Sequence, residues 1–204
     1  MLAVYREQLT NSLLETICFF RIIIDMTPMY VALLRGINVG GNTKVEMKKL
    51  KAFFERMNFA DVSTYINSGN VLFRTNHPKS TLASRIEKFI EEDFGFPIRV
   101  VVRDQTQISE IAEKVPKNWT NDTEQKTDVI FLWDDVDSPK VLQEIVTNPK
   151  VDQLIYINGA VIWHIDRAHY NQSGMHKFIG TGIYKQMTAR NINTVRKLRD
   201  LMKK

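Results

Sequence analysis

The sequence predicts an α+β protein made of a tandem repeat of two ferredoxin-like (βαββαβ) halves, the second less complete. Three observations predict it. From Tyr30 to residue 102, strand-like apolar runs and helix-like periodicity follow one another in the order βαββαβ. A second cycle of strand, short helix and hairpin starts at residue 128. The hairpins of the two cycles also share letters, because "YINSGNVLF" (65–73) is similar to "YINGAVIW" (156–163), which favours a duplication.

The first cycle is defined by its apolar runs and its turn residues. "YVALL" (30–34) is typical of a buried strand, and the helix after it has an apolar face that begins at Met47. "VSTYI" and "VLF" flank "NSGN" (67–70) and predict a hairpin. A second helix is expected between Pro78 and Gly95, followed by the strand "IRVVV" (98–102).

A connecting helix should lead out of the first cycle. Asp104 is expected to cap it, with Gln107 at the third helical position, and Pro116 ends it. The polar, turn-rich stretch that follows is the best candidate for a linker. We therefore divide the chain into an extension (1–28), a first half (29–116), a linker (117–127) and a second half (128–204).

The second cycle begins with the strand "DVIFLW" (128–133). Ser138 and Pro139 should open a short helix. The Asn158-Gly159 pair between "LIYIN" and "AVIWHI" is a strong hairpin signal. An amphipathic basic helix is expected to close the chain.

Residues 1–28 differ in character from the rest. "TICFFRIIID" (16–25) is apolar, but it is too short to span a membrane and Arg21 interrupts it. The segment is either an N-terminal helix packed on the body or the product of an upstream start codon, with the true start at Met29 or Met26. We favour the upstream start, because "MYVALLRG" needs nothing before it to form a first strand.

Composition restricts the function only broadly. The net charge is +5 and the pI about 9.3, which suits an acidic ligand. Cys18 is the single cysteine, so no disulfide forms within the chain, and nothing points to export. We therefore expect a cytoplasmic protein without a membrane partner. The sequence does not define an oligomeric state.

The stretch "LLRGINVGGNTKVEM" (33–47) is the first candidate site. Gly36 and Gly41 have the spacing of a phosphate-binding loop, but Asn42 stands where that loop has its lysine. Backbone N–H groups near the glycines and the start of the next helix still favour an anion. The candidate ligand-binding residues are Arg35, Gly36, Asn38, Gly40, Gly41 and Lys44. The alternative is a tight turn in which glycine satisfies a positive φ and Arg35 forms a structural ion pair.

The hairpin tip "NSGN" supplies Asn67, Ser68 and Asn70 as further candidates. A structural turn is the default interpretation, because asparagine hydrogen-bonds its own backbone. The functional alternative is a polar rim beside the glycine turn. We expect the two motifs at opposite ends of the sheet, which argues against one site built from both.

The chain end "YKQMTARNINTVRKLRDLMKK" (184–204) carries a third cluster. The structural alternative is a closing helix whose basic face is solvated. We nevertheless expect the entry of this helix to be a binding surface, because an anion is favoured at a helix N-terminus. The candidate residues are Lys185, Thr188, Arg190, Asn191 and Thr194.

Two other groups of residues give weaker evidence for a functional site. His164, Asp166, His169 and His176 are close in sequence, but their spacing matches no recognised zinc motif. Ser173 lies near two histidines without a nucleophile elbow around it. We therefore expect no metal and no cofactor, and no catalytic residue can be assigned.

Three stretches together resemble one known family. "LLRGINVGGNTKVEM", "TYINSGNVLF" (64–73) and "TARNINTVRKL" (188–198), in this order, resemble the family termed domain of unknown function 1697. The resemblance covers about residues 29–202. It implies a small, soluble, mostly bacterial protein with two ferredoxin-like halves and an unestablished activity. The family often has Arg-Asn-Trp where this chain has Arg190-Asn191-Ile192, which counts against aromatic stacking there.

Three classes of function remain open. The leading hypothesis is the binding of a phosphorylated or otherwise anionic, nucleotide-like small molecule. The second is an enzyme acting on such a ligand, which would have to stabilise charge with backbone amides and arginines. The third is a module for protein interaction or weak nucleic-acid binding. The base-stacking signature of RNA-recognition motifs is incomplete here, because "SGNVLFR" has Phe73 as its one aromatic residue.

Overall fold

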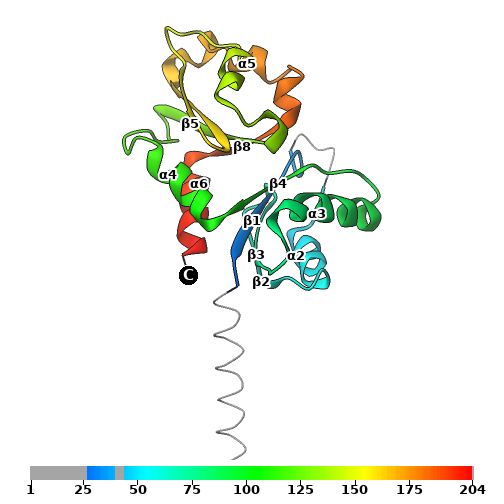
Figure 1. Ribbon diagram of the computed structural model, residues 1–204. Coiled ribbons are helices and arrows are strands. Elements are labelled where there is room, and N and C mark those ends of the chain that lie inside the picture. The colour runs from blue at the N-terminus through cyan, green and yellow to red at the C-terminus, as the bar shows by residue number, and fades with distance from the viewer. Residues whose placement is uncertain (1–26, 40–43, 204) are drawn as a thin grey trace, which may run out of the picture.

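The computed structural model describes residues 27–39 and 44–203 and contains two four-stranded antiparallel sheets (Figure 1). The expected N-terminal extension lies almost entirely outside the described residues. The mixed α+β class is confirmed.

The first sheet has the strand order β2-β3-β1-β4, and two helices connect its strands. Its elements are β1 (Met29–Leu34), α2 (Met47–Arg56), β2 (Ala60–Tyr65), β3 (Asn70–Arg74), α3 (Lys79–Phe94) and β4 (Val100–Asp104). The predicted hairpin is confirmed, because β2 pairs with β3 across the "NSGN" turn, where Gly69 has a φ of 75°. A side chain at Gly69 would be strained in this left-handed conformation.

The connecting helix α4 (Gln105–Lys114) begins directly after β4. Asp104 caps it as expected: its Oδ1 accepts from the backbone N–H of Gln107 at 2.9 Å, and the Gln107 side chain accepts from the Asp104 N–H. Lys79 of α3 donates to the other carboxylate oxygen of Asp104. One side chain thus fixes the direction of α4 and ties it to α3.

The second sheet has the corresponding order, β6-β7-β5-β8. Its strands are β5 (Gln125–Leu132), β6 (Gln153–Ile157), β7 (Ala160–Asp166) and β8 (Met187–Asn191), and α6 (Ile192–Met202) follows. Short elements connect them, namely the 3-10 helices η1 (Asp134–Val136), η2 (Pro139–Gln143), η3 (Arg167–Gln172) and η4 (Ile183–Gln186), and α5 (Met175–Phe178). Ser138 accepts a hydrogen bond at the start of η2, as expected.

Three expectations need correction. The segment expected to be a linker, 117–127, overlaps β5, which starts at Gln125 because the pairing with β7 extends to Asp166. The second sheet has as many strands as the first, since residues 187–191 pair with β5 rather than joining the last helix. The second half is less complete than the first in the helices that connect its strands.

The third correction concerns the glycine turn and the "NSGN" hairpin, which lie at the same end of the first sheet. Because β1 and β2 both pair antiparallel to β3, they run parallel and end at the same edge. The backbone N–H of Leu34 donates to the carbonyl of Gly69 over 2.8 Å, and Asn38 Nδ2 donates to the carbonyl of Asn67 over 2.8 Å.

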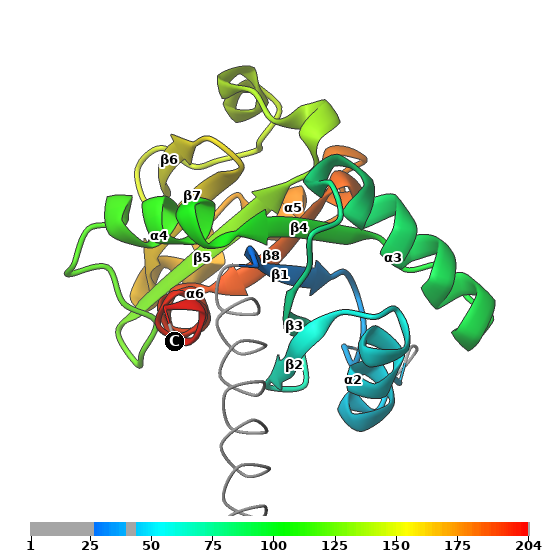
Figure 2. The same cartoon turned by 60° about the horizontal axis from the view of Figure 1, so that its bottom comes forward.

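The apolar residues form two clusters, one on each face of the first sheet. Tyr30, Ala32 and Leu34 of β1 face α2 and α3, which Figure 1 shows together on that side. Val31 and Leu33 face the other way and join the core shared by α4, α6 and the second sheet. Figure 2 shows α4 and α6 beside the strands of both sheets. The alternation along β1 therefore joins the two sheets through one continuous core.

The first strands of the two sheets end in matching ways. Leu34 donates to the carbonyl of Gly69, and Leu132 at the end of β5 donates to the carbonyl of Gly159 over 3.0 Å. The next residues are Arg35 and Trp133, whose backbone N–H groups donate to Arg99 and Gln186. Leu34 therefore corresponds to Leu132, Gly69 to Gly159, and Arg35 to Trp133.

Among the helices in the described part of the chain, none combines the length and the apolar character that crossing a membrane requires.

Candidate functional site

A cavity of about 590 Å³ lies where β1 ends beside β8, and we call it the arginine cavity. Three segments form it: the turn after β1, the approach to β4, and the residues from α5 to β8. Its lining residues are Arg35, Gly36, Val39, Pro97, Ile98, Arg99, Ile179, Tyr184, Thr188, Ala189 and Arg190. Residues from the glycine turn and from the chain end, both candidates from the sequence, thus meet around one space.

Arg35 connects the turn after β1 to the second sheet. Its Nη1 donates to the carbonyl of Met187 over 2.7 Å, and its guanidinium lies 5.2 Å from the centre of the Tyr184 ring. Among the described residues, Arg35 has no carboxylate at ion-pair distance, so the ion pair of the alternative interpretation is not formed there. The side chain is half-buried and keeps further N–H groups for a ligand.

Arg190 is buried, and all its N–H groups are used inside the protein. Nε donates to Asn70 Oδ1 over 2.6 Å, Nη1 to Thr188 and Ala189, and Nη2 to the carbonyls of Leu34 and Gly69. Arg190 therefore has no N–H group left for a direct ligand contact. Burial lowers the pKa of Arg190 to about 10, although nearby Tyr184 opposes that shift.

The Arg190 side chain still affects the cavity electrostatically. At neutral pH a group with this pKa stays protonated, and within the described parts of the chain no carboxylate forms an ion pair with it. Its partners are neutral carbonyl, amide and hydroxyl oxygens. A buried positive charge without a counter-ion favours anions in the adjacent space.

The sequence pattern did not single out Arg99 and Tyr184. Arg99 comes just before β4, is exposed, and donates to Glu87 Oε1 over 3.2 Å. Its guanidinium also lies 5.0 Å from the centre of the Trp133 ring. No local motif marks either residue, because their role depends on contacts between segments far apart in sequence. The one weak sign of Arg99 in the sequence was its place at the start of an apolar strand.

The other candidates lie elsewhere. Asn38, Lys44 and Asn67 line a separate hollow of about 690 Å³ beside the start of α2. Ser68 accepts a hydrogen bond from Asn70 Nδ2, and Lys185 is exposed on η4. Gly40 and Gly41 lie outside the described residues, so the phosphate-loop prediction stays a prediction for that part.

The N-terminus of α6 is capped by a side chain of the protein itself. The side chain of Asn191 is the N-cap and accepts from the backbone N–H of Thr194 over 2.9 Å. Thr188 and Arg190 are on β8 rather than in the helix. The helix start itself is therefore no longer the candidate anion site. The candidate is instead the adjacent cavity, which Thr188 and Arg190 line.

The histidine-rich segment has a structural explanation. His164 is buried, shares a hydrogen bond with Thr127 at 2.8 Å, and stacks on Trp119. Ser173 donates to Asp152 and lies in a buried hydrogen-bond network. Within the described residues, no three His, Cys, Asp or Glu side chains are grouped so as to hold a metal ion.

The fold and this cavity define a class: an α+β protein with two four-stranded antiparallel sheets and an arginine-lined cavity between them. The chain belongs to the family described as "Protein of unknown function (DUF1697)", whose model matches residues 26–163. The family resemblance seen in the sequence is thus confirmed.

The chain is similar over most of its length to a solved structure. That structure is the conserved bacterial protein SP0830 from Streptococcus pneumoniae, with 26% sequence identity and a TM-score of 0.75. The match covers 86% of this chain and 99% of that protein. A comparison with curated proteins gave no significant match.

Proposed function

We propose that the arginine cavity binds a phosphorylated or otherwise anionic small molecule, and that the protein is cytoplasmic. One observation carries the proposal: the described residues that line the cavity include three arginines and no carboxylate. Arginine presents a planar set of donors that suits phosphate and carboxylate oxygens. Burial of Arg190 without a counter-ion adds to the positive potential.

The arginines would divide the work. Arg35 is half-buried and has free N–H groups, so it is the proposed direct ligand contact. Arg99 would approach from the neighbouring chain segment, where its carbonyl accepts from the Arg35 N–H, although its bond to Glu87 reduces its net charge effect. Arg190 would not contact the ligand directly, because its hydrogen bonds are already made. It would instead hold the neighbouring groups in position and contribute positive electrostatic potential.

The apolar part of the lining supports a ligand larger than a simple anion. Val39 and Ile179 are 66% and 46% exposed, and the Tyr184 ring lies below Arg35. Ligand sites commonly combine such apolar surface with a few placed polar groups. A nucleotide-like or sugar-phosphate compound fits both features.

We also propose that the two sheets derive from duplication of one ferredoxin-like unit. The identical strand order, the matching bonds at Leu34 and Leu132, and the shared Tyr-Ile-Asn before each hairpin turn support it. The cavity would then lie at the junction between two repeats.

The proposal is tested by a thermal-shift screen with pyrophosphate, nucleoside monophosphates, sugar phosphates and short oligonucleotides. A ligand at about 100 times its Kd adds roughly 2.7 kcal/mol of stability. We expect a stabilising compound whose effect falls in both Arg35→Ala and Arg99→Ala. Arg56→Ala, which removes an exposed arginine on α2, is the matched control and should keep the effect.

Each variant is first melted without ligand, because Arg35→Ala also removes the bond to Met187. Ligand effects that persist undiminished in both cavity variants would contradict the proposal, as would the absence of any anionic ligand. Stabilisation by oligonucleotides alone, lost steeply with added salt, would instead favour weak nucleic-acid binding.

A further inference from the structure

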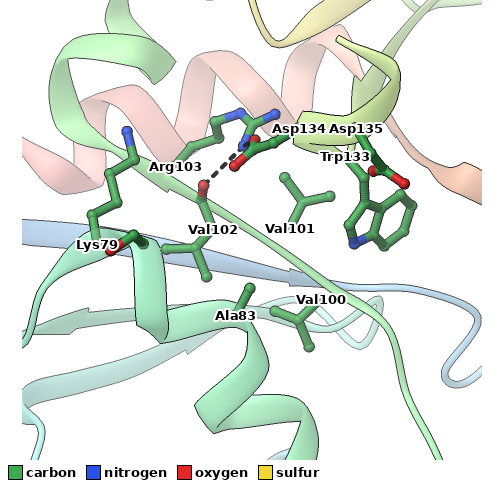
Figure 3. A pocket seen from close by; sticks show the side chains of 10 residues that line it. Lys79, Ala83, Val100, Val101, Val102, Arg103, Trp133, Asp134 and Asp135 are labelled. Carbon is green, nitrogen blue, oxygen red and sulfur yellow. Dashed lines mark hydrogen bonds and ion pairs between the residues drawn. The ribbon is translucent and has the colours of Figure 1, made fainter.

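A second cavity, of about 630 Å³, occupies the corresponding place at the end of β5, and we call it the tryptophan cavity. The arginine cavity combines the residues after β1 with β8. The tryptophan cavity combines Trp133, Asp134 and Asp135, which follow β5, with β4 (Figure 3). The correspondence of Arg35 and Trp133 relates the two spaces.

The charge at the mouth of this cavity is reversed. Asp134 and Asp135 stand where the first sheet has Gly36 and Ile37, and both are exposed. Asp134 is 3.6 Å from Arg103 Nη1. Asp135 has neither a hydrogen-bond nor an ion-pair partner among the described residues, so its carboxylate is available to a cation.

Trp133 supplies an independent indication of a ligand. Trp133 is 7% exposed, and its indole Nε1 is buried without a hydrogen-bond acceptor. Figure 3 shows this nitrogen on the side of the ring that faces Val100 and Val101, which line the cavity. A buried N–H without an acceptor is unfavourable, so an oxygen atom placed there by a ligand would be stabilised.

The positive groups near this cavity have partners of their own. The guanidinium of Arg99 lies 5.0 Å from the centre of the Trp133 ring, and its Nε donates to Glu87 Oε1. Lys79 lies at the far side, and its Nζ donates to Asp104 and Gln107. Arg103 Nη1 and Nη2 donate to backbone carbonyls, including those of Leu132 and Gly159. The ligand would therefore meet two carboxylates, one indole N–H and the apolar valine wall.

We propose that the tryptophan cavity binds a small organic ammonium compound that also carries a hydroxyl or carbonyl oxygen. The ammonium group lies against Asp134 and Asp135, where charge-assisted hydrogen bonds form. The oxygen accepts from Trp133 Nε1, and the methylene groups between them lie along Val100 and Val101. This proposal does not rest on the proposed anion site, although Arg99 lines the arginine cavity and also lies over the Trp133 ring.

The test uses ethanolamine as the probe and the indole N–H resonances of the full chain as the readout. The chain has three tryptophans, so the signal of Trp133 is assigned by through-bond experiments on the unmutated protein. We expect ethanolamine to shift the Trp133 signal and to leave those of Trp119 and Trp163 in place. Propylamine, which lacks the oxygen, should bind more weakly and shift it less.

Asp135→Asn should raise the Kd for ethanolamine about tenfold, since it removes one charge-assisted contact. Glu110→Gln, an exposed carboxylate on α4 outside the cavity, is the control and should leave the Kd unchanged. Neither change removes a buried group. The proposal is overturned if the Trp133 signal does not respond, if glycolate shifts it as much as ethanolamine, or if Asp135→Asn binds normally.

Discussion

Arg103 and Arg190 occupy corresponding positions on β4 and β8, and each donates to the backbone of the other sheet. Nη2 of Arg190 bonds the carbonyls of Leu34 and Gly69, at 2.9 and 3.4 Å. Nη2 of Arg103 bonds the corresponding carbonyls of Leu132 and Gly159. Two buried cations thus fasten the sheets to each other in a reciprocal way.

The two arginines differ in the partner of Nε. Nε of Arg190 donates to Asn70, whereas Nε of Arg103 is buried without an acceptor. Asn70 follows Gly69, and the residue that follows Gly159 is Ala160, which has no acceptor in its side chain. The second contact is therefore a less complete copy of the first.

Replacing Arg190 should destabilise the whole protein. Arg190→Ala leaves the buried oxygens of Leu34 and Asn70 without their donor, and we expect a loss of at least about 3 kcal/mol in the free energy of unfolding. The carbonyl of Gly69 keeps the backbone N–H of Leu34 as a donor. Urea denaturation followed by circular dichroism measures the loss. Arg56→Ala, which breaks an exposed ion pair with Asp93, should cost at most about 1 kcal/mol. Equal effects of the two changes would show that the buried contact contributes little.

Asn70→Ala removes the acceptor that the Arg103 contact lacks, together with the two bonds that Asn70 Nδ2 donates to Tyr65 and Ser68. The change leaves Nε of Arg190 without an acceptor, and we expect a cost of about 1–3 kcal/mol by the same denaturation experiment. Asn193→Ala removes an exposed amide bond to the carbonyl of Asn121 and should cost less than about 0.5 kcal/mol. If Asn70→Ala is as mild as this control, Arg190 does not need the Asn70 acceptor.

Asp152 should make stability depend on acid pH. Burial raises the pKa of its carboxyl, but hydrogen bonds from Asn148, Ser173, Gly174 and Trp163 together hold that pKa below its usual value. The stabilisation is therefore complete above the unfolded pKa of about 3.9 and is lost as the pH falls through the folded pKa.

The variant Asp152→Asn tests this dependence. At pH 7 it should be less stable than the unmutated protein by about 1–3 kcal/mol, because an amide cannot accept all four bonds. Unfolding at pH 7 and pH 3 should show that this difference narrows in acid. A difference that is constant across this range would mean that the charge of Asp152 is unimportant.

Gly174 should not tolerate a side chain. A Cβ there would lie 2.3 Å from the carbonyl oxygen of Val146 and 2.6 Å from the Cα of Thr147, and both are backbone atoms. Gly174→Ala should therefore cost more than about 1–3 kcal/mol, or prevent folding. At Gly180 the nearest atom is a carbonyl oxygen 3.9 Å away, so Gly180→Ala is the matched control. Melting temperatures of the two variants should differ clearly, and similar values would contradict the steric argument.

Local signals in the sequence were sufficient for most of the elements and insufficient for the site. Three motifs were predicted correctly because each depends on residues close together in the chain. They are the Asp104 capping box, the "NSGN" hairpin and the Asn158-Gly159 hairpin. The strand 187–191 was missed because its pairing partner, β5, lies more than fifty residues away in the chain.

The arginine cavity shows the same limit. Arg35 and Arg190 were selected because they flank a glycine turn and a helix start, but their meeting around one space depends on contacts between the sheets. The roles of Arg99 and Arg103 depend wholly on such contacts, and an arginine within an apolar run carries no local sign of its partner. Whether Arg35 contacts a ligand stays a prediction.

The shared core also has a consequence for how the chain folds during synthesis. Val31, Leu33 and Val101 on one face of the first sheet pack in the cluster that includes Val195 and Leu198 of α6. These helical residues are synthesised after all the strands of both sheets. We therefore expect part of the apolar face of the first sheet to stay uncovered until α6 has been made, a period in which chaperones would have access to it.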